Sequence, residues 1–372
     1  MTISLSGPDI GPKEKELVNE VLDSEWLSLG PKLDEFEEKF AEYIGTDYAI
    51  GVNSGTSGLH LLIRAMGIGE GDEVITTPFS FISSSNCILF EGATPVFVDI
   101  DPDTLWIDTD KIEEKITDKT KAILAVDVFG QPANMEEIME LANKYDLKVI
   151  EDSCEAIGAE HNGNKVGTIA DASVFAFYPN KQMTTGEGGM IVTDDEEIAS
   201  LCDSMRNQGR SNNSQWLSHV RLGYNYRLDE MSCALGIAQL ERIEEILEKR
   251  TEVAKKYNSL FEDIDEVKIL KIDKRTTKMS WFVYVIQLAE GIDRNEVMNY
   301  LRDNDIQCKP YFTPIHLQPF YKKQFGYKRG DFPITEKVTD STIALPFYNN
   351  LKDEEIEYVV EKVKEGIERY QN

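Results

Sequence analysis

Short apolar runs alternate with helix-like segments between residues 45 and 195. The runs are rich in β-branched and aromatic residues, which favour strands, whereas residues 135–145 carry apolar side chains at helical spacing. Strands that alternate with helices predict a largely parallel sheet covered by helices. The seven expected strands lie near residues 48–52, 73–77, 95–99, 122–126, 148–151, 172–177 and 190–193.

The pattern changes on either side of this region. An amphipathic segment at 31–44 precedes the sheet and is expected to pack outside it, and a long helix is expected over 229–261. Shorter elements follow, with strands near 280–288 and 306–312 and helices at 293–303 and 353–370. We therefore predict a large α/β domain over residues 1–250 and a smaller α+β domain over residues 251–372.

Composition excludes several classes of protein. The formal net charge of −28 argues against binding to nucleic acid or to an anionic membrane, since no basic stripe offsets it. No apolar run reaches the roughly 18 residues of a spanning helix, and the opening residues do not resemble a signal peptide, so we expect a cytoplasmic protein. The 5 scattered cysteines and 4 histidines show no ligand spacing, which favours a mechanism without a metal.

Residues 53–58, with the sequence NSGTSG, leave a strand and open a helix-like run. Such a turn directs free backbone N–H groups and the positive end of a helix at one point, which suits a phosphate group. Thr56 and Ser57 add hydroxyl donors. The turn matches neither a Walker loop nor the glycine fingerprint of dinucleotide-binding folds, and a plain helix cap explains it equally well.

Two further candidates follow in the chain. Asp152 ends the apolar strand KVIED, at the edge where such sheets bind ligands, although a helix N-cap explains it slightly better when it is taken alone. Lys181 lies between two strands in a loop of glycines and threonines, which implies tight backbone geometry around one fixed amine. A lone lysine is otherwise usually a solvated surface residue.

Together, the three features have one economical explanation. A phosphate cradle, a carboxylate and a lysine amine are the parts needed to hold pyridoxal 5′-phosphate (PLP). They would anchor the phosphate, pair with the pyridinium nitrogen and attach the cofactor covalently. The carboxylate keeps the ring nitrogen protonated, so that the ring accepts the electrons released when the substrate loses its α-proton. The freed lysine amine can then move that proton.

The sequence resembles the sugar aminotransferases of the DegT/DnrJ/EryC1/StrS family over nearly its whole length. The resemblance implies a PLP-dependent transferase of fold type I, like aspartate aminotransferase, with a mostly parallel seven-stranded sheet. The most specific motifs are NSGTSGLHL, TTPFSFISSSNCI, VIEDSCEAIGAEHNGNKVG, FAFYPNKQMTTGEGG and LGYNYRLDEMSCALGIAQL.

The resemblance also implies cofactor-binding residues by position. Lys181 matches the lysine that carries the cofactor and moves the proton, and Asp152 matches the acid that pairs with the pyridine nitrogen. Phe81 matches the aromatic ring that stacks on the cofactor. Asn225 matches an asparagine that reaches the cofactor phosphate of the neighbouring subunit, which implies a homodimer with shared active sites. The remaining matches are Glu155, often Gln in this family, near the ring hydroxyl, and Gly55, Thr56 and Ser57 on the phosphate-binding turn.

Two positions separate this chain from parts of the family. Ala176 stands where many members have a serine whose hydroxyl helps to bind the phosphate. Phosphate binding is therefore expected to depend on the 55–57 turn and on Asn225. A branch with His in place of Lys181 performs sugar 3-dehydration, and Lys181 argues against that activity.

Residues that contact the substrates are less sharply indicated. His316, Tyr311 and Arg227 are candidates for the sugar site, and a structural role for His316 is an equal alternative. Charges that could neutralise a nucleotide diphosphate or the carboxylates of the amino donor are Arg210, Arg221, Arg227 and Lys309.

The resemblance implies a reaction in two halves. Glutamate gives its amine to PLP, which leaves 2-oxoglutarate and the pyridoxamine 5′-phosphate form, and a nucleotide-linked keto-sugar then takes the amine. Likeness to perosamine-synthase-like members favours C4 of a nucleoside-diphosphate-linked 4-keto-6-deoxyhexose. The alternatives are amination at C3 and a regulatory protein that binds PLP without turnover.

Overall fold

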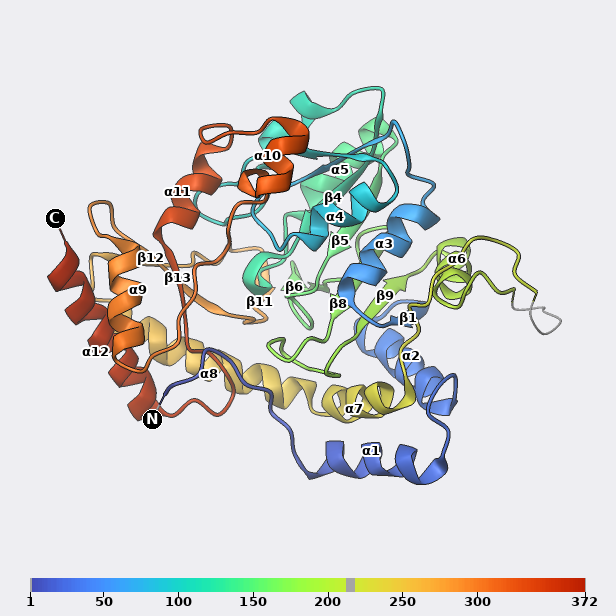
Figure 1. The fold of residues 1–372 in the computed structure, drawn as a ribbon, viewed down its shortest axis with the longest axis horizontal. Helices are drawn as coiled ribbons and strands as arrows, with labels where there is room; N and C mark the ends of the chain where they lie inside the picture. Colours follow the sequence, from blue (N-terminus) through green and yellow to red (C-terminus); the bar gives the residue numbers. More distant parts are fainter. Residues whose placement is uncertain (1, 212–217, 372) are drawn as a thin grey trace.

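A large sheet flanked by helices, with a smaller sheet beside it, forms the fold in a computed structural model that describes residues 2–211 and 218–371 (Figure 1). The large sheet has seven strands in the order β1-β9-β8-β5-β4-β2-β3. Only β9 is antiparallel to its neighbours in this sheet. The strands are β1 (Tyr48–Val52), β2 (Glu73–Thr76), β3 (Thr94–Phe97), β4 (Thr120–Val126), β5 (Lys148–Asp152), β8 (Ala172–Ala176) and β9 (Gly189–Thr193).

The central strands are apolar because helices cover both faces of the sheet. Along β4, Ile123 and Ala125 pack with one core cluster and Ala122 and Leu124 pack with another. Successive side chains of a strand point to opposite faces, so a strand buried on both faces shows a continuous apolar run and no alternation. This sheet confirms the predicted mostly parallel architecture.

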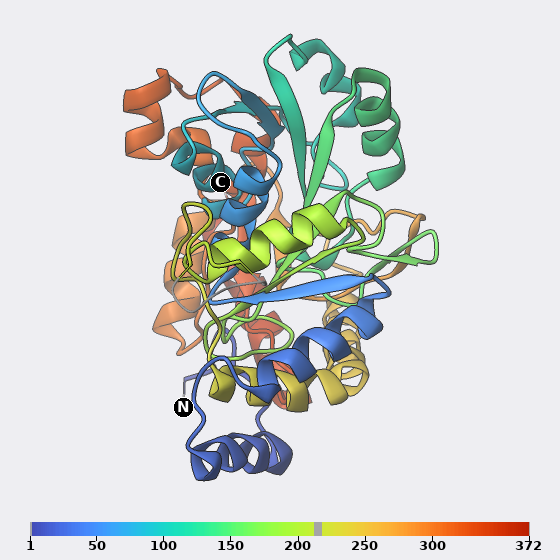
Figure 2. The same cartoon turned by 90° about the vertical axis from the view of Figure 1, so that its right-hand side faces the viewer.

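Two groups of helices cover the faces of the large sheet. The apolar sides of α3, α4 and α6 share a core cluster with β1 and β8; Figure 2 shows the molecule from the side on which α6 lies. The opposite face carries α5 and, towards β9, a layer of α1, α2 and α7. Bounds are α1 (Pro12–Ser24), α2 (Pro31–Ile44), α3 (Gly55–Ala65), α4 (Ser83–Phe90), α5 (Met135–Tyr145), α6 (Glu196–Arg206) and α7 (Glu230–Glu241).

The smaller sheet is antiparallel and has its own core. The chain passes from one core to the other inside α8, where Ile246 and Leu247 pack with the large domain and Val253 and Ala254 pack with the second core. The predicted boundary between residues 250 and 251 stays a prediction. The elements are α8 (Ile243–Phe261), β10 (Val267–Ile269), β12 (Tyr284–Leu288), α9 (Arg294–Asp303), β13 (Thr342–Leu345) and α12 (Asp353–Tyr370).

The other short elements lie around these two sheets. A third small sheet has the order β11-β6-β7. No helix within residues 2–211 and 218–371 is long and apolar enough to cross a membrane, and no three metal-ligating side chains gather at one place within those ranges. The elements are β6 (Glu160–His161), β7 (Asn164–Lys165), β11 (Thr276–Lys278), α10 (Pro319–Phe325) and α11 (Pro333–Ser341).

Three expected elements differ from the structure. The single helix expected over 229–261 is two helices, because the backbone leaves the helical region at Arg242 with φ −110° and ψ 8°. The expected strand at 306–312 is wrong: Ile306 and Lys309 form only isolated bridges, and Pro310 lacks the N–H that a ladder needs. The strand expected from residue 280 begins at Tyr284, because the N–H of Ser280 bonds to Gly130 of the large domain at 3.1 Å.

Candidate active site

Asp152 is the last residue of β5, at the carboxyl edge of the parallel strands. Its side chain accepts hydrogen bonds from Ser84 Oγ at 2.7 Å and from the backbone N–H of Cys154 at 3.3 Å. Both donors are neutral, and in the part of the chain that the structure describes no cationic side chain forms an ion pair with this carboxylate. A carboxylate that is only 5% exposed is costly without a cation, so this position fits a protonated ring nitrogen.

Lys181 lies in the loop that joins β8 to β9, which we call the Lys181 loop (residues 177–188). Its amine is 3.4 Å from Oε1 of Glu155 and 3.9 Å from the centre of the Phe282 ring. The face of an aromatic ring attracts a cation, so two groups hold the amine from separate segments of the chain. The side chain is only 13% exposed, which leaves a nearly enclosed amine at the sheet edge.

Glu155 connects this lysine to the rest of the site. Its second oxygen, Oε2, accepts a hydrogen bond from the N–H of Phe129 at 2.9 Å. Burial raises the pKa of the Glu155 carboxyl group, the Lys181 ammonium and the Phe129 N–H oppose that shift, and the Asp152 carboxylate adds to it. Asp152, Glu155, Lys181 and Phe282 therefore form one electrostatic unit, the Lys181 cluster.

The start of α3 lies against both ends of the Lys181 loop. A methyl group on Gly55 would lie 2.8 Å from Cβ of Ala176 and 2.8 Å from Sγ of Cys154. One on Gly189 would lie 2.8 Å from the backbone N of Gly55. These distances leave no room for a side chain at either glycine, so the glycines permit the close approach.

The turn at 53–58 is both a helix cap and a source of free donors. Ser54 Oγ accepts the N–H of Ser57 at 3.1 Å, and Ser57 Oγ donates to Asn53 Oδ1 at 2.6 Å. The first bond of the helix backbone runs from Gly58 to Ser54, so the N–H groups of Gly55 and Thr56 precede it. Such groups at a helix N-terminus suit an anion, and the cap and phosphate interpretations are compatible.

Phe81 lies between β2 and α4 with 62% of its surface exposed. Its carbonyl accepts a hydrogen bond from Ser84 Oγ at 3.2 Å, and the same hydroxyl donates to Asp152. A serine thus connects the backbone at the exposed ring to the buried carboxylate. An exposed aromatic face beside a ring-binding acid fits a planar cofactor.

Asn225 lies beside the α3 turn of its own chain. Its backbone carbonyl accepts Asn53 Nδ2 at 3.4 Å, and the carbonyl of Tyr226 accepts the N–H of Asn53 at 2.9 Å. The side chain of Asn225 is exposed, and its contact with a neighbouring subunit stays a prediction. Arg227 follows in the same segment and donates to Asn207 Oδ1 at 3.2 Å.

Tyr311 and His316 occupy different places. The Tyr311 ring lies 6.4 Å from that of Phe282, and burial together with the Glu155 carboxylate raises the pKa of the Tyr311 hydroxyl. His316 is 0% exposed, and its Nε2 lies 3.0 Å from Oε1 of Glu336. The structure therefore brings Tyr311 to the Lys181 cluster, whereas the position of His316 favours the structural alternative.

The other three candidate cations are Arg210, Arg221 and Lys309. Arg221 and Lys309 are exposed, and Arg210 pairs with His219 through the backbone. Within residues 2–211 and 218–371, none of these three contacts Lys181 or Asp152. Their predicted role in binding a diphosphate or carboxylate stays a prediction.

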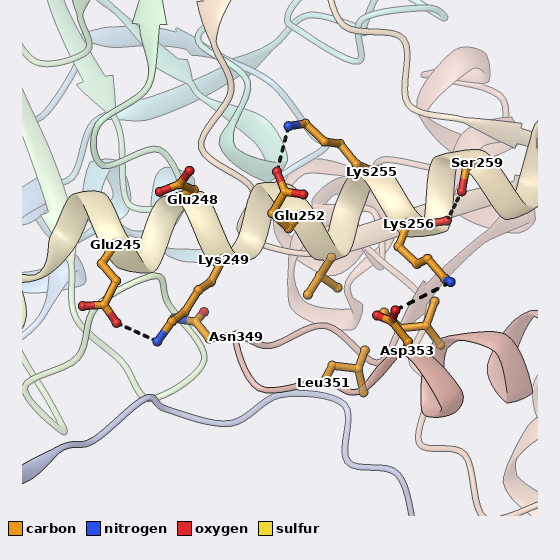
Figure 3. A pocket seen from close by; sticks show the side chains of 12 residues that line it. Glu245, Glu248, Lys249, Glu252, Lys255, Lys256, Ser259, Asn349, Leu351 and Asp353 are labelled. Carbon is orange, nitrogen blue, oxygen red and sulfur yellow. Dashed lines mark hydrogen bonds and ion pairs between the residues drawn. The ribbon is translucent and has the colours of Figure 1, made fainter.

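A hollow of about 760 Å³ lies elsewhere, along α8 and the start of α12 (Figure 3). No member of the Lys181 cluster lines it. Its lysines are matched by acids within the hollow or at its rim, as in the pairs Lys249–Glu245 at 2.7 Å, Lys255–Glu252 at 2.8 Å and Lys256–Asp353 at 3.7 Å. A hollow whose charges are already paired offers little to a charged substrate, so the sheet edge at Lys181 is the better candidate for the active site.

Sequence reasoning missed several residues that build the site. Ser84 and Phe129 contact the two carboxylates, and Phe282 holds the lysine amine. Arg250 donates to the backbone carbonyl of Lys181 at 3.1 Å. A signal for Arg250 exists, because it occupies a position on α8 where the helical spacing of the apolar residues around it predicts an apolar side chain.

Comparison with known proteins gives one consistent result. The DegT/DnrJ/EryC1/StrS aminotransferase family matches residues 8–364. The chain is 41% identical over 360 residues to GDP-perosamine synthase of Escherichia coli O157:H7, covering 96% of each chain. It superimposes on PseC of Helicobacter pylori, an aminotransferase of pseudoaminic acid biosynthesis, with a TM-score of 0.95 and 31% identity over 100% of both chains. S. venezuelae DesV, solved with a ketimine intermediate, gives a TM-score of 0.90 and 33% identity over 96% of this chain and 94% of that one.

These likenesses confirm the predicted fold type I and the predicted enzyme class, a sugar aminotransferase that depends on PLP. The side chains at the sheet edge agree with that cofactor: a nearly enclosed lysine amine, a buried carboxylate without a cation, an exposed aromatic ring and free N–H groups at a helix start. The chain therefore belongs to the DegT/DnrJ/EryC1/StrS aminotransferase family.

Proposed function

We propose that this chain moves the amino group of glutamate to C4 of a nucleotide-linked 4-keto-6-deoxyhexose, as a cytoplasmic homodimer that holds PLP at Lys181. The observation that carries the proposal is the Lys181 cluster, where a nearly enclosed amine lies beside a buried carboxylate that has no cation of its own. When bound, PLP supplies a ring that accepts electrons from the carbon that loses its proton.

The residues of the cluster divide the work. Lys181 would bond to the cofactor. Once its amine is released from the cofactor, that amine would move the α-proton of the substrate. Asp152 stabilises the proton on the ring nitrogen, and Ser84 orients the carboxylate through its 2.7 Å hydrogen bond. Glu155 keeps the released amine within reach, at the 3.4 Å distance observed here.

Two further contacts fix the cofactor. The N–H groups of Gly55 and Thr56, at the positive end of α3, bind the phosphate. Phe81 covers one face of the ring. Ala176 offers no hydroxyl, so the backbone donors of the turn and Asn225 of a second subunit take the phosphate charge.

The sugar substrate is supported by likeness. The E. coli relative is named for a GDP-linked sugar, and it aligns over 96% of this chain. That likeness supports a nucleotide-linked keto-sugar and favours C4, with C3 as the alternative. Tyr311, which lies beside Phe282 at the Lys181 cluster, is the candidate for a sugar contact.

Exposed apolar side chains support the dimer. Trp26 is 58% exposed and Leu29 is 44% exposed, in a segment that bridges to Asp229. Val220 and Leu222 are 55% and 67% exposed in the segment that leads to Asn225. Large exposed apolar side chains favour association, and these lie on two segments that lead to Asn225 or bridge to Asp229 shortly after it.

The test is an absorbance spectrum of the purified chain with PLP, before and after glutamate, with Lys181→Ala as the control. We expect the band of lysine-bound PLP only when Lys181 is present, and its conversion by glutamate to the pyridoxamine 5′-phosphate band. Keto-sugar nucleotides then follow as acceptors, and NMR of the product identifies the aminated carbon.

Each outcome separates one alternative. A lysine-bound band that glutamate leaves unchanged would favour another amino donor or a regulatory protein without turnover. Amination at C3 would correct the regiochemistry alone. Absence of the lysine-bound band would contradict the role of Lys181.

A further inference from the structure

Arg250 is a buried cation without an acidic partner. It lies on α8 with 2% of its surface exposed, and in the described ranges no carboxylate forms an ion pair with it. Burial lowers the pKa of its guanidinium group to about 10, so the group still carries its proton at neutral pH. A charge buried in this way opposes folding unless its hydrogen bonds compensate, so its contacts indicate what the guanidinium group does.

Within the described residues Arg250 donates hydrogen bonds to three backbone carbonyls around the Lys181 cluster, and its guanidinium group also lies 5.5 Å from the centre of the Phe347 ring. Nη2 donates to the carbonyl of Lys181 at 3.1 Å, and Nη1 donates to the carbonyls of Phe282 at 3.2 Å and Trp281 at 3.4 Å. One planar group therefore joins the Lys181 loop to the segment that leads into β12. The donors of a guanidinium group have fixed relative positions, so the two segments are held in a defined geometry.

The side chains of the joined residues also touch each other. The Lys181 amine lies 3.9 Å from the centre of the Phe282 ring, and Arg250 holds the main chain at both ends of that contact. Gln182 forms a second bridge nearby, because its Nε2 donates to the carbonyl of Glu155 at 2.6 Å and to Ser280 Oγ at 2.8 Å. The amine is thus positioned through its backbone as well as through its side-chain contacts.

We propose that Arg250 is a positioning residue for Lys181: it sets where the amine lies relative to Phe282 and Glu155, and thereby how fast the amine bonds to PLP. The inference rests on the proposed function only in that Lys181 carries the cofactor. In the step concerned, the neutral amine nitrogen bonds to the aldehyde carbon of PLP, and the aldehyde oxygen leaves as water with the two amine hydrogens.

Loss of the guanidinium group has two physical effects. The three carbonyls lose a buried donor, which lowers stability. The Lys181 backbone also loses its link to Phe282, so the amine samples positions from which it cannot reach the aldehyde carbon. Misplacement of a reacting group by about 1 Å can slow a reaction by roughly 100-fold, so we expect attachment to slow by at least about tenfold.

The experiment measures the rate at which PLP becomes lysine-bound in the apo protein, by stopped-flow absorbance, in wild type, Arg250→Lys and Arg250→Met. Borohydride reduction followed by peptide mass spectrometry identifies Lys181 as the attached residue. Arg250→Lys keeps the charge and loses the planar fork, so it separates geometry from charge. The matched control is Tyr257→Phe, at a position on the same helix as Arg250. It removes a 2.9 Å hydrogen bond to the carbonyl of Pro346, and no contact of Tyr257 involves Lys181 in the described residues. Thermal unfolding of each apo protein reports the structural cost separately.

Slower attachment in Arg250→Lys, with a wild-type rate in Tyr257→Phe at a comparable loss of stability, would support the proposal. A wild-type attachment rate in folded Arg250→Lys would overturn it and leave Arg250 a structural residue. If Arg250→Met does not fold, Arg250→Lys decides alone. Absence of lysine-bound PLP in the wild-type chain would overturn both the proposed function and this inference. If wild type attaches PLP normally, the rate in Arg250→Lys tests this inference alone.

Discussion

The Lys181 cluster and the His316–Glu336 pair are both buried groups of acids and bases, but their hydrogen bonding differs. Glu336 accepts His316 Nε2 at 3.0 Å, the N–H of Gly330 at 2.8 and 2.9 Å and the N–H of Phe332 at 3.4 Å. Asp152 accepts from Ser84 and from the Cys154 N–H, and in the described part of the chain it has no ionic partner.

This difference separates a structural cluster from a functional one. At Glu336 the protein supplies three donors to the carboxylate, so the carboxylate needs no ligand, although Nδ1 of His316 has no hydrogen-bond partner among the described residues. At Asp152 the carboxylate keeps bonding capacity, and the exposed Phe81 ring adds apolar surface without a partner. Buried carboxylates without a cation are expected where a protein binds something else, because stability alone would select against them.

The largest effect is expected from Asp152→Asn. The variant keeps the shape of the side chain but cannot stabilise a protonated ring nitrogen, so kcat should fall by about 10²–10³-fold. Stability should change little or rise, because a buried charge without a cation is removed. Steady-state kinetics and urea unfolding check the two parts. Near-normal turnover combined with a large loss of stability would instead make Asp152 a structural residue.

His316→Asn should show the opposite profile. The shorter side chain leaves space beside Phe332, whose ring lies 4.7 Å from the His316 ring, and it weakens the contact with Glu336. We expect a loss of about 2–3 kcal/mol in the free energy of unfolding, with kcat changed less than about threefold. His219→Asn, at an exposed position, is the control for stability. A raised KM for the sugar in a variant of normal stability would restore His316 to the substrate site.

The pH dependence of stability should identify the same histidine. Burial lowers the pKa of His316, and Glu336 opposes this only in part. Below its ordinary pKa of about 6.5, the unfolded histidine takes up a proton that the folded one resists, so stability falls as the pH falls through this window. His60, whose pKa is also lowered by burial, adds a similar slope in both proteins. Urea unfolding from pH 7.5 to 5.5 should therefore show a smaller slope in His316→Asn than in wild type, and equal slopes would contradict the assignment.

The smallest effect is expected from Glu155→Gln. The amide oxygen can still accept the Phe129 N–H, so kcat should change by less than about tenfold. Burial raises the pKa of Glu155, so the folded state keeps this proton above the ordinary pKa, and wild type loses stability as the pH rises through that window. The variant lacks this loss and should gain stability relative to wild type between pH 4.5 and neutrality. Urea titrations of both proteins over this range measure the difference, and a constant offset at every pH would rule out the titration of Glu155 as its cause.

Much of the fold could be predicted because it depends on local patterns. The helices at 31–44 and 135–145 have the predicted bounds, since their apolar spacing ends where a glycine or a left-handed residue ends the helix. The segment at 306–312 could not be predicted in the same way. Its apolar run resembles a strand, but its backbone partners, Ile3 and Ala344, are far away in the sequence.

The same distinction between local patterns and long-range contacts applies to the residues of the site. Lys181 and Asp152 could be proposed from motifs because Asp152 ends a strand and Lys181 lies in the loop between two strands, where a short stretch of sequence identifies the position. The helical spacing could mark Arg250 as an unusual charge, but neither Arg250 nor Phe282 could be assigned to the site, because a pattern that predicts a helix or a strand says nothing about which loop that element meets. Their contribution depends on how the second core packs against the large sheet.

The contact of Gly55 with Ala176 and Gly189 has a further consequence. Ala176 ends β8 and Gly189 begins β9, so the Lys181 loop leaves and returns at two small residues that touch the start of α3. A larger side chain at either place would separate the helix from the strands by roughly the width of a methyl group, since packed interiors have no spare volume. Because these two residues are small, the start of the helix stays close to the Lys181 loop. That short distance limits the length of a ligand that spans from the helix start to the lysine amine. Redesign for a longer or shorter ligand would begin at these contacts, before any residue that touches the ligand is changed.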